Sequence, residues 1–238
     1  MRLALIGYGK MGKAIEGVAL QRGHEVVLRV SRSNLQELNT ENLSKADAAI
    51  EFTNPHSAFE NVKTCLDLGI PVICGSTGWT DKLEQLKQLC AEKKGGFIYS
   101  SNYSVGVNIF FEINKKLAAL MAGHKEYEVI LEETHHTQKK DAPSGTAITL
   151  AEQILGELKR KKQWVNELSD DPEDLEIISQ RIDPAPGTHH IRYSSAIDDI
   201  EIIHTAHNRQ GFATGAVLAA EFIRGKQGFF TMKEVLHL

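Results

Sequence analysis

The residues Leu3-Ala4-Leu5-Ile6-Gly7-Tyr8-Gly9-Lys10-Met11-Gly12 decide the fold class of this chain. The four apolar residues predict a buried strand, and the next six match the pattern G-x-G-x-x-G at the start of a helix. There Gly7 permits a tight turn, Gly9 lets the backbone approach a pyrophosphate, and Gly12 lets the helix pack closely on the strand. The free N–H groups of the helix start would bind the phosphates. We therefore expect Gly7–Gly12 to bind a dinucleotide; the alternative is a tight turn without a ligand.

Strand-like and helix-like segments alternate through the first hundred residues. The expected strands are Leu3–Ile6, Val26–Val30, Ala48–Phe52, Val72–Cys74 and Phe97–Tyr99. The expected helices are Met11–Arg22, His56–Leu68 and Asp81–Lys93. This alternation is typical of βαβ units and a parallel sheet. The segment Ser33–Ser44 is short, so we expect one reduced crossover there.

The pattern changes after residue 104, where several strands accompany only two helices. The expected helices are Val105–Met121 and Thr146–Lys161, and the expected strands are Tyr127–Glu133, Leu175–Ile182, His189–Ser194 and Ile200–Ala206. Polar loops are expected at His135–Pro143 and Glu167–Glu176, and a helical tail at Gly211–Arg224. We therefore predict an α/β protein with a dinucleotide-binding domain at 1–104 and 208–238, and a smaller α+β domain at 105–207.

Composition excludes several classes of protein. Lys and Arg number 27 against 31 Asp and Glu, a net charge of −4, whereas nucleic-acid binding proteins usually have a basic balance. No apolar run reaches the ~18 residues of a membrane span, and the first residues lack the layout of a signal peptide. Three cysteines without a C-x-x-C pair favour reduced thiols. We expect a cytoplasmic protein that binds neither nucleic acid nor membrane.

The residues after the second strand bear on the choice of cofactor. An acidic residue about 20 positions after the glycines would bind the ribose hydroxyl of NAD, but this chain has Ser31-Arg32-Ser33 there. The planar, charged donors of Arg32 suit a 2′-phosphate, so we expect NADPH, with NADH possible. The alternative for Arg32 is a solvated loop. Two loops at the ends of later strands are candidates for the nicotinamide side or ordinary turns. They are Phe52–Pro55, with Phe52 and Thr53, and Gly75–Gly78, with Gly75, Ser76 and Thr77.

The densest chemical segment is Glu132–Ala147, with two His, two Lys and an Asp between a strand and a helix. Ser144, Gly145 and Thr146 stand at the expected helix start, where hydroxyls and backbone N–H groups cap the helix or hold an anion. Cations beside an anion site favour a carboxylate substrate. His135 can exchange a proton near neutral pH.

Residues Glu133–Ala147 resemble the signature E-x-H-H-x-x-K-x-D-A-P-S-G-T-A of the 4-hydroxy-tetrahydrodipicolinate reductase family, also called dihydrodipicolinate reductase. Other resembling stretches are Gly7–Gly12, Glu51–Thr53, Gly75–Trp79, Asn102–Asn108, Pro186–His189 and Arg209–Ala216. The resemblance implies a Rossmann domain, an α+β domain that binds substrate and builds a homotetramer, and a C-terminal helix that returns to the first domain. It implies NAD(P)H-dependent reduction of the cyclic imine 4-hydroxy-tetrahydrodipicolinate, via dihydrodipicolinate, to tetrahydrodipicolinate in the diaminopimelate route of lysine biosynthesis.

The same resemblance implies residue roles. His135 would be the acid/base residue, and Lys139 the proton donor that assists loss of water. The substrate carboxylates would be held by His136, Lys139, Ser144, Gly145 and Thr146. The nicotinamide would be lined by Gly75, Ser76, Thr77, Ser100, Ser101, Asn102 and Tyr103. Lys140 adjoins Lys139, so whether it shares that role stays open.

Three alternatives remain. A metal site at His135-His136 is disfavoured, because adjacent strand residues point to opposite faces and H-E-x-x-H spacing is absent, so we expect no metal. A non-catalytic NADP(H)-binding sensor on the same scaffold is disfavoured by the presence of His135 and Lys139. A different small dehydrogenase, such as one for amino acids, is disfavoured by the His-His-x-x-Lys segment followed by Ser-Gly-Thr.

Overall fold

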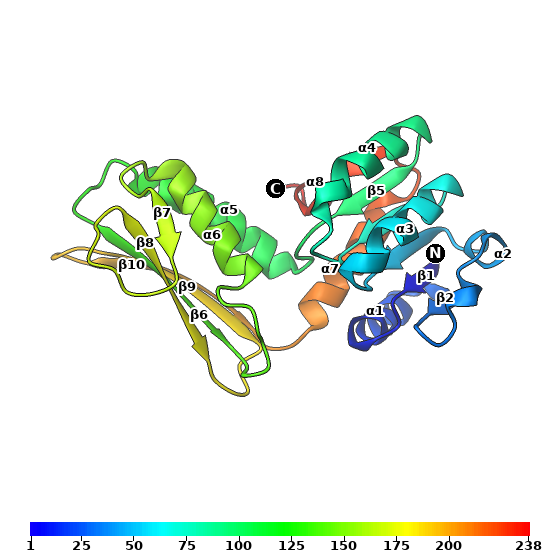
Figure 1. Ribbon diagram of the computed structural model, residues 1–238, viewed down its shortest axis with the longest axis horizontal. Helices are drawn as coiled ribbons and strands as arrows, with labels where there is room; N and C mark the ends of the chain where they lie inside the picture. The colour runs from blue at the N-terminus through cyan, green and yellow to red at the C-terminus, as the bar shows by residue number, and fades with distance from the viewer. The chain divides into compact units, whose positions relative to one another are not determined.

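The computed structural model describes residues 1–238 and divides them into two compact units, whose elements are labelled in Figure 1. One unit contains Met1–Val105 and Arg209–Leu238, and the other contains Gly106–Asn208. These junctions differ by one residue from the predicted divisions at 104/105 and 207/208. None of the helices has both the length and the apolar character needed to cross a bilayer.

The first unit is built on a six-stranded parallel sheet with the order β11-β5-β4-β3-β1-β2. Its strands are β1 (Arg2–Ile6), β2 (Glu25–Val30), β3 (Ala48–Glu51), β4 (Val72–Cys74), β5 (Gly96–Tyr99) and β11 (Gly228–Phe230). The first five match the predicted strands to within two residues at either end. The strand β11 was not predicted, because it has only three residues and depends on pairing with β5 at the edge of the sheet.

Helices cover both faces of this sheet (Figure 1). They are α1 (Lys10–Gln21), α3 (Pro55–Asp67), α4 (Leu83–Glu92), α7 (Gln210–Ile223) and α8 (Met232–Leu236). Alternate residues of β1 point to opposite faces, so Leu3 and Leu5 pack with α1 and α7, whereas Ala4 and Ile6 pack with α3 and α4. The short connection after β2 holds only η1 (Leu35–Glu37) and α2 (Thr40–Leu43), which confirms the reduced crossover; η2 (Thr80–Lys82) precedes α4. The three cysteines are buried and unpaired.

The second unit is a five-stranded mixed sheet with the order β10-β9-β6-β8-β7, and α5 and α6 lie on one face of it (Figure 1). Its elements are α5 (Val105–Met121), β6 (Glu128–His135), α6 (Gly145–Glu157), β7 (Gln163–Val165), β8 (Asp174–Arg181), β9 (Gly187–Ser194) and β10 (Asp199–Ala206). Leu131, Ile177 and Ile191 from three strands pack against Leu150 and Ile154 of α6. This apolar layer fixes which face of β6 is buried.

Two predicted boundaries in this unit were wrong, and one strand was missed. The strand β6 continues to His135, so this histidine belongs to a strand rather than to the loop. The helix α6 ends at Glu157 rather than at Lys161. Beyond the helix, Lys161 is buried and its Nζ lies 3.0 Å from a carboxylate oxygen of Glu128, a tertiary contact that overrides the helical pattern. The strand β7 was not predicted, because it is an edge strand of three residues.

Candidate functional site

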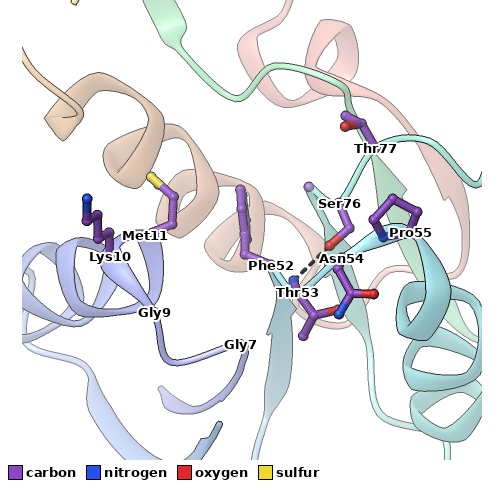
Figure 2. Close-up of a pocket in the computed structure, with 11 residues that line it drawn as sticks. Gly7, Gly9, Lys10, Met11, Phe52, Thr53, Asn54, Pro55, Ser76 and Thr77 are labelled. Atoms are coloured by element: carbon purple, nitrogen blue, oxygen red, sulfur yellow. Dashed lines mark hydrogen bonds between the residues drawn. The ribbon is translucent and has the colours of Figure 1, made fainter. Parts of the chain in front are cut away.

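A pocket of about 380 Å³ lies at the carboxyl ends of β1, β3 and β4 in the first unit (Figure 2). Its lining contains nine of the predicted cofactor residues: Gly7, Gly9, Lys10, Met11, Phe52, Thr53, Gly75, Ser76 and Thr77. Asn54 and Pro55, which complete the predicted loop Phe52–Pro55, also line it. This edge of an open parallel sheet is where such folds bind ligands, so the pocket brings the glycine loop and the two later loops together.

The glycines of the pocket serve two different purposes. Gly7 has φ +103°, and an added Cβ would lie 2.1 Å from the carbonyl oxygen of Phe52. At Gly12 an added Cβ would lie 2.5 Å from the carbonyl oxygen of Gly7, and at Gly75 it would enter the ring of Phe52. At Gly9, by contrast, a Cβ would meet no atom within 4 Å. Gly9 precedes α1 without capping it by a side chain, so the first N–H groups of that helix face open space that suits a phosphate.

A buried carboxylate ties two of the pocket loops together. Glu51 at the end of β3 is fully buried and accepts hydrogen bonds from the Thr53 amide at 3.0 Å and from the Cys74 thiol at 3.0 Å. The Thr53 amide also lies 2.8 Å from Oγ of Ser76, the bond drawn in Figure 2. Burial and the adjacent charge of Glu51 raise the pKa of the Cys74 thiol. The thiol therefore stays protonated and acts as a donor.

Other predicted cofactor residues do not line this pocket. They are Tyr8, Gly12, Arg32, Ser100, Ser101, Asn102 and Tyr103. Tyr103 is buried, and its hydroxyl lies 2.9 Å from the carbonyl oxygen of Cys74 and 3.3 Å from that of Ile98. Ser100 Oγ donates to the carbonyl oxygen of Asn102 at 2.7 Å. These contacts make the segment a brace between the ends of β4 and β5.

Two further residues of that group, Tyr8 and Arg32, lie at the surface of the first unit, just before α1 and just after β2. The hydroxyl of Tyr8 donates to Glu16, which also accepts from Arg29. This hydrogen bond with Glu16 raises the pKa of Tyr8. Arg32 is exposed in the turn after β2, beside Ser31 and Ser33, whose hydroxyl oxygens lie 2.8 Å apart. Its guanidinium therefore remains open to solvent and to a ligand.

In the second unit, β6 places His135 beside a buried carboxylate. Glu133 and His135 stand two residues apart on the strand and so share its buried face. Nε2 of His135 lies 3.4 Å from Oε2 of Glu133, and Nε2 of His189 on β9 lies 3.7 Å from the same oxygen. Burial opposes the charge of Glu133, but the adjacent His135 ring and hydrogen bonds from Ser144, Ser179 and Arg181 hold its pKa well below the usual range. Glu133 is therefore an anion at neutral pH.

His189 is the neutral member of this cluster. Burial, followed by the charge of His135, lowers the pKa of His189 to about 4. Its Nε2 lies 3.2 Å from Oγ of Ser144. Glu133, His135 and His189 each have one atom that could bind a metal ion, and these three atoms lie within 4.8 Å of one another. Since both Glu133 oxygens already face N–H and O–H donors, the cluster has the character of a hydrogen-bond network.

The loop after β6 carries the candidate cations. Lys139 is half-buried and its Nζ lies 2.7 Å from Oδ2 of Asp141, whereas Lys140 is exposed. The guanidinium of Arg181 donates to the carbonyl oxygens of Lys139 and Asp141, at 3.3 and 2.5 Å. Nδ1 of His136 is buried without a hydrogen-bond partner. The two lysines therefore differ in burial and in hydrogen-bond partners.

The start of α6 completes this cluster. Ser144 caps the helix by accepting a hydrogen bond from the Ala147 amide at 3.2 Å, and its own amide donates to Glu133. An added Cβ at Gly145 would meet no atom within 4 Å. The first turn of a 13-residue helix is thus open at Gly145, next to Thr146, where its N–H groups can receive a carboxylate.

Sequence reasoning missed the roles of Glu133, Ser179 and Arg181 in this cluster. Their partners come from β6, β8 and α6, so no local pattern connects them. One signal was available. Val129, Leu131, Glu133 and His135 alternate with less buried residues, and a Glu on the buried side of such a strand requires partners.

The glycine-lined pocket of the parallel sheet and the His, Lys and carboxylate cluster define a two-domain oxidoreductase that binds a nicotinamide dinucleotide. Family models agree: residues 1–103 match the N-terminal model and residues 106–236 the C-terminal model of dihydrodipicolinate reductase. The chain therefore belongs to the dihydrodipicolinate reductase family.

Individual relatives cover almost the whole chain. The 4-hydroxy-tetrahydrodipicolinate reductase of Christiangramia forsetii is 47% identical over 238 residues, which is 99% of this chain and 98% of that protein. That of Alkaliphilus oremlandii is 33% identical, over 97% of this chain and 95% of its own length. Among solved structures, the dipicolinate-bound dihydrodipicolinate reductase of a Paenisporosarcina species has a TM-score of 0.78 and 26% identity over 98% of both chains. A probable dehydrogenase of Thermotoga maritima, at 10% identity and a TM-score of 0.58, shares the fold.

Proposed function

We propose that this chain reduces the cyclic imine 4-hydroxy-tetrahydrodipicolinate, via dihydrodipicolinate, to tetrahydrodipicolinate, with NADPH as the preferred reductant. The observation that carries the proposal is the cluster at the end of β6. There a buried Glu133 anion, the His135 imidazole and the open first turn of α6 lie together with the Lys139 loop. Relatives that carry the name of this activity cover the full length of the chain.

The first unit would hold the cofactor. The open space at Gly9 beside the free N–H groups of α1 suits the pyrophosphate, and the loops of Thr53 and Ser76 would approach the nicotinamide. Exposed Arg32 would bind the 2′-phosphate that distinguishes NADPH from NADH. The Ser100–Tyr103 segment would lie on the nicotinamide side and hold the ends of β4 and β5 in place there. The bound nicotinamide supplies the hydride.

The residues of the second unit would hold the substrate and move protons. The two carboxylates would bind the ammonium of Lys139, the ring of His136, the hydroxyl of Ser144 and the N–H groups of Gly145 and Thr146. The unpartnered Nδ1 of His136 supports this assignment, because a buried ring nitrogen needs a partner. Lys139 would donate the proton that assists departure of the hydroxyl group as water. His135 would give a proton to the electron-rich product of hydride addition.

The test follows NADPH oxidation at 340 nm, with substrate formed in situ from pyruvate and aspartate semialdehyde by the preceding synthase. We expect NADPH oxidation that depends on the presence of both pyruvate and aspartate semialdehyde. Oxidation of NADH should be slower. Dipicolinate should inhibit the reaction in competition with the imine. Cofactor binding without oxidation would contradict the proposal and leave a non-catalytic NADP(H) sensor in its place.

We also propose a homotetramer. The face of the second sheet opposite α5 and α6 carries Ile203, which is 57% exposed on the edge strand β10. The proposal rests on the homotetramer that the family resemblance implies, and this sheet face is the surface where a second copy would pack. Light scattering coupled to gel filtration should give four times the 26.4 kDa mass of the chain, and a monomer would contradict the proposal.

A further inference from the structure

Glu133 and Arg181, to which no role has been assigned above, form an ion pair inside the second unit. Arg181 ends β8, and its backbone is the register partner of His135 in the parallel pair β6–β8. Its guanidinium NH2 group lies 3.0 Å from Oε1 of Glu133. The carboxylate is fully buried and the arginine side chain is 20% exposed. This ion pair joins β6, which carries His135, to β8, and further hydrogen bonds of the same guanidinium reach the loop that carries Lys139.

The hydrogen bonds of His135 show what Glu133 does to the ring. Nδ1 of His135 lies 3.3 Å from the carbonyl oxygen of Pro186, and a carbonyl only accepts, so Nδ1 carries a proton. Nε2 then faces the Glu133 carboxylate at 3.4 Å, an ion-pair distance rather than that of a short hydrogen bond. A neutral ring of this tautomer would point a lone pair at an anion. Protonation of Nε2 replaces that repulsion with attraction.

The His135 ring is also fixed by close packing against the backbone of β9. An added Cβ at Gly187 would lie 2.8 Å from Cε1 of His135, so the backbone of β9 packs directly against the imidazole. Other titratable or charged groups face this position. They are His189 from β9, Lys139 from the loop, Arg181 from β8 and, next to His189, His204 from β10. Glu133 is the carboxylate that faces the ring, and the next anion, Asp141 of the loop, is paired with Lys139.

Arg181, the partner of Glu133, also contacts the backbone of the loop that carries Lys139. Its guanidinium bonds four groups at once: the Glu133 carboxylate and the carbonyl oxygens of Lys139, Asp141 and Gln180. The Lys139 ammonium is in turn 2.7 Å from the Asp141 carboxylate. The backbone on which this lysine stands is therefore fixed by one planar side chain, a geometry that Lys cannot reproduce.

We propose that Glu133 and Arg181 are positioning residues of the reductase, Glu133 by holding a proton on His135 and Arg181 by fixing the loop of Lys139. Neither side chain needs to touch the substrate. This inference rests on the function proposed above. Loss of Glu133 should change the protonation of His135, whereas loss of Arg181 should weaken the binding of substrate.

The experiment compares the full-length wild-type chain with Glu133→Gln, Glu133→Asp and Arg181→Lys. The matched control is Glu132→Gln, whose carboxylate lies on the opposite face of β6 and pairs with His190. Thermal unfolding and NADPH affinity are measured first for each variant. The readouts are the pH profile of kcat, the titration of the His135 imidazole by long-range ¹H–¹⁵N NMR, and calorimetric affinity for dipicolinate.

For Glu133→Gln we expect kcat to fall at least tenfold, and Nε2 of the His135 imidazole to be less protonated at a given pH than in wild type. Burial of the ring is the same in both proteins, so the difference isolates the carboxylate. The alkaline limb of the kcat profile should move the same way, and Glu133→Asp should recover part of both shifts. If Glu133→Gln fails to fold, Glu133→Asp provides the test. It should shift the protonation of His135 and the kcat profile in the same direction by a smaller amount.

For Arg181→Lys we expect kcat/KM and dipicolinate affinity to fall about tenfold or more, while the imidazole titration stays as in wild type. Unchanged imidazole titration in Glu133→Gln, or wild-type dipicolinate affinity in Arg181→Lys, would overturn the corresponding half of the inference. Wild-type protein without reductase activity would refute the proposed function instead, and the NMR and dipicolinate measurements would still decide these two roles.

Discussion

The backbone of Gly7 touches the carbonyl group of Phe52, so closely that a Cβ on Gly7 would lie 2.1 Å from the carbonyl oxygen. This contact joins the turn after β1 to the loop after β3 and closes one wall of the pocket. Two residues further along, Gly9 has the opposite surroundings, since nothing lies within 4 Å of its added Cβ. One glycine is thus required by the fold, and the other leaves room for a ligand.

This contrast predicts opposite effects of the same substitution. Gly9→Ala should leave the unfolding temperature nearly unchanged and weaken NADPH binding about tenfold or more, because the methyl group enters the phosphate space. Gly7→Ala should lower the free energy of unfolding by about 3 kcal/mol or more, through backbone clash and a φ of +103°. Thermal unfolding and fluorescence titration measure both. Wild-type affinity in Gly9→Ala would contradict the proposed cofactor position.

Arg32 should determine the preference between the two cofactors. Arg32→Ala should weaken NADPH binding about tenfold or more and leave NADH binding unchanged, because only NADPH carries the 2′-phosphate. Arg22→Ala is the control, since it removes an arginine of the same unit that pairs with Glu221. Equal losses for both cofactors, or equal losses in the control, would indicate a general charge effect.

The two adjacent lysines should differ in kinetics. Lys139→Ala should lower kcat/KM about a hundredfold or more, because it removes a proton donor and a carboxylate ligand. Lys140→Ala should change kcat/KM less than threefold, because Lys140 is exposed while the backbone of Lys139 is held by Arg181. Steady-state assays at 340 nm provide the measurement. The reverse ranking would place the functional cation at Lys140.

Buried His189 should make the stability of the second unit depend on pH. Its pKa is about 4 in the folded state against an ordinary value of 6.5, so the unfolded chain binds the proton more readily. The stabilisation from keeping this ring neutral is complete above pH 6.5 and is lost as the pH falls toward 4. The difference in pKa corresponds to about 3 kcal/mol at most.

Urea unfolding at pH 7.5 and pH 5.0 tests this effect. Wild type should lose more stability between the two values than His189→Gln does. His124→Gln should behave like wild type, because His124 is exposed and its pair with Glu126 lies in solvent. Parallel losses in wild type and His189→Gln would show that other groups carry the pH dependence.

Much of this protein follows from local sequence. The glycine pattern, the alternation of apolar runs with helical periodicity, and the change of pattern near residue 104 predicted both domains and the order of their longer helices and strands. The dense segment Glu132–Ala147 predicted where the chemistry is concentrated. These signals are readable because hydrophobic periodicity and turn residues report local backbone geometry directly.

The tertiary structure alone decided the remaining features. The strands β7 and β11 have three residues each and exist through pairing with neighbouring strands. Tyr103 braces the ends of β4 and β5, although its position in the sequence resembles a cofactor contact. Glu133, Arg181 and His189 stand on three different strands and meet through register alone. Strand register depends on long-range packing, so a buried charge network appears only once the sheet is assembled.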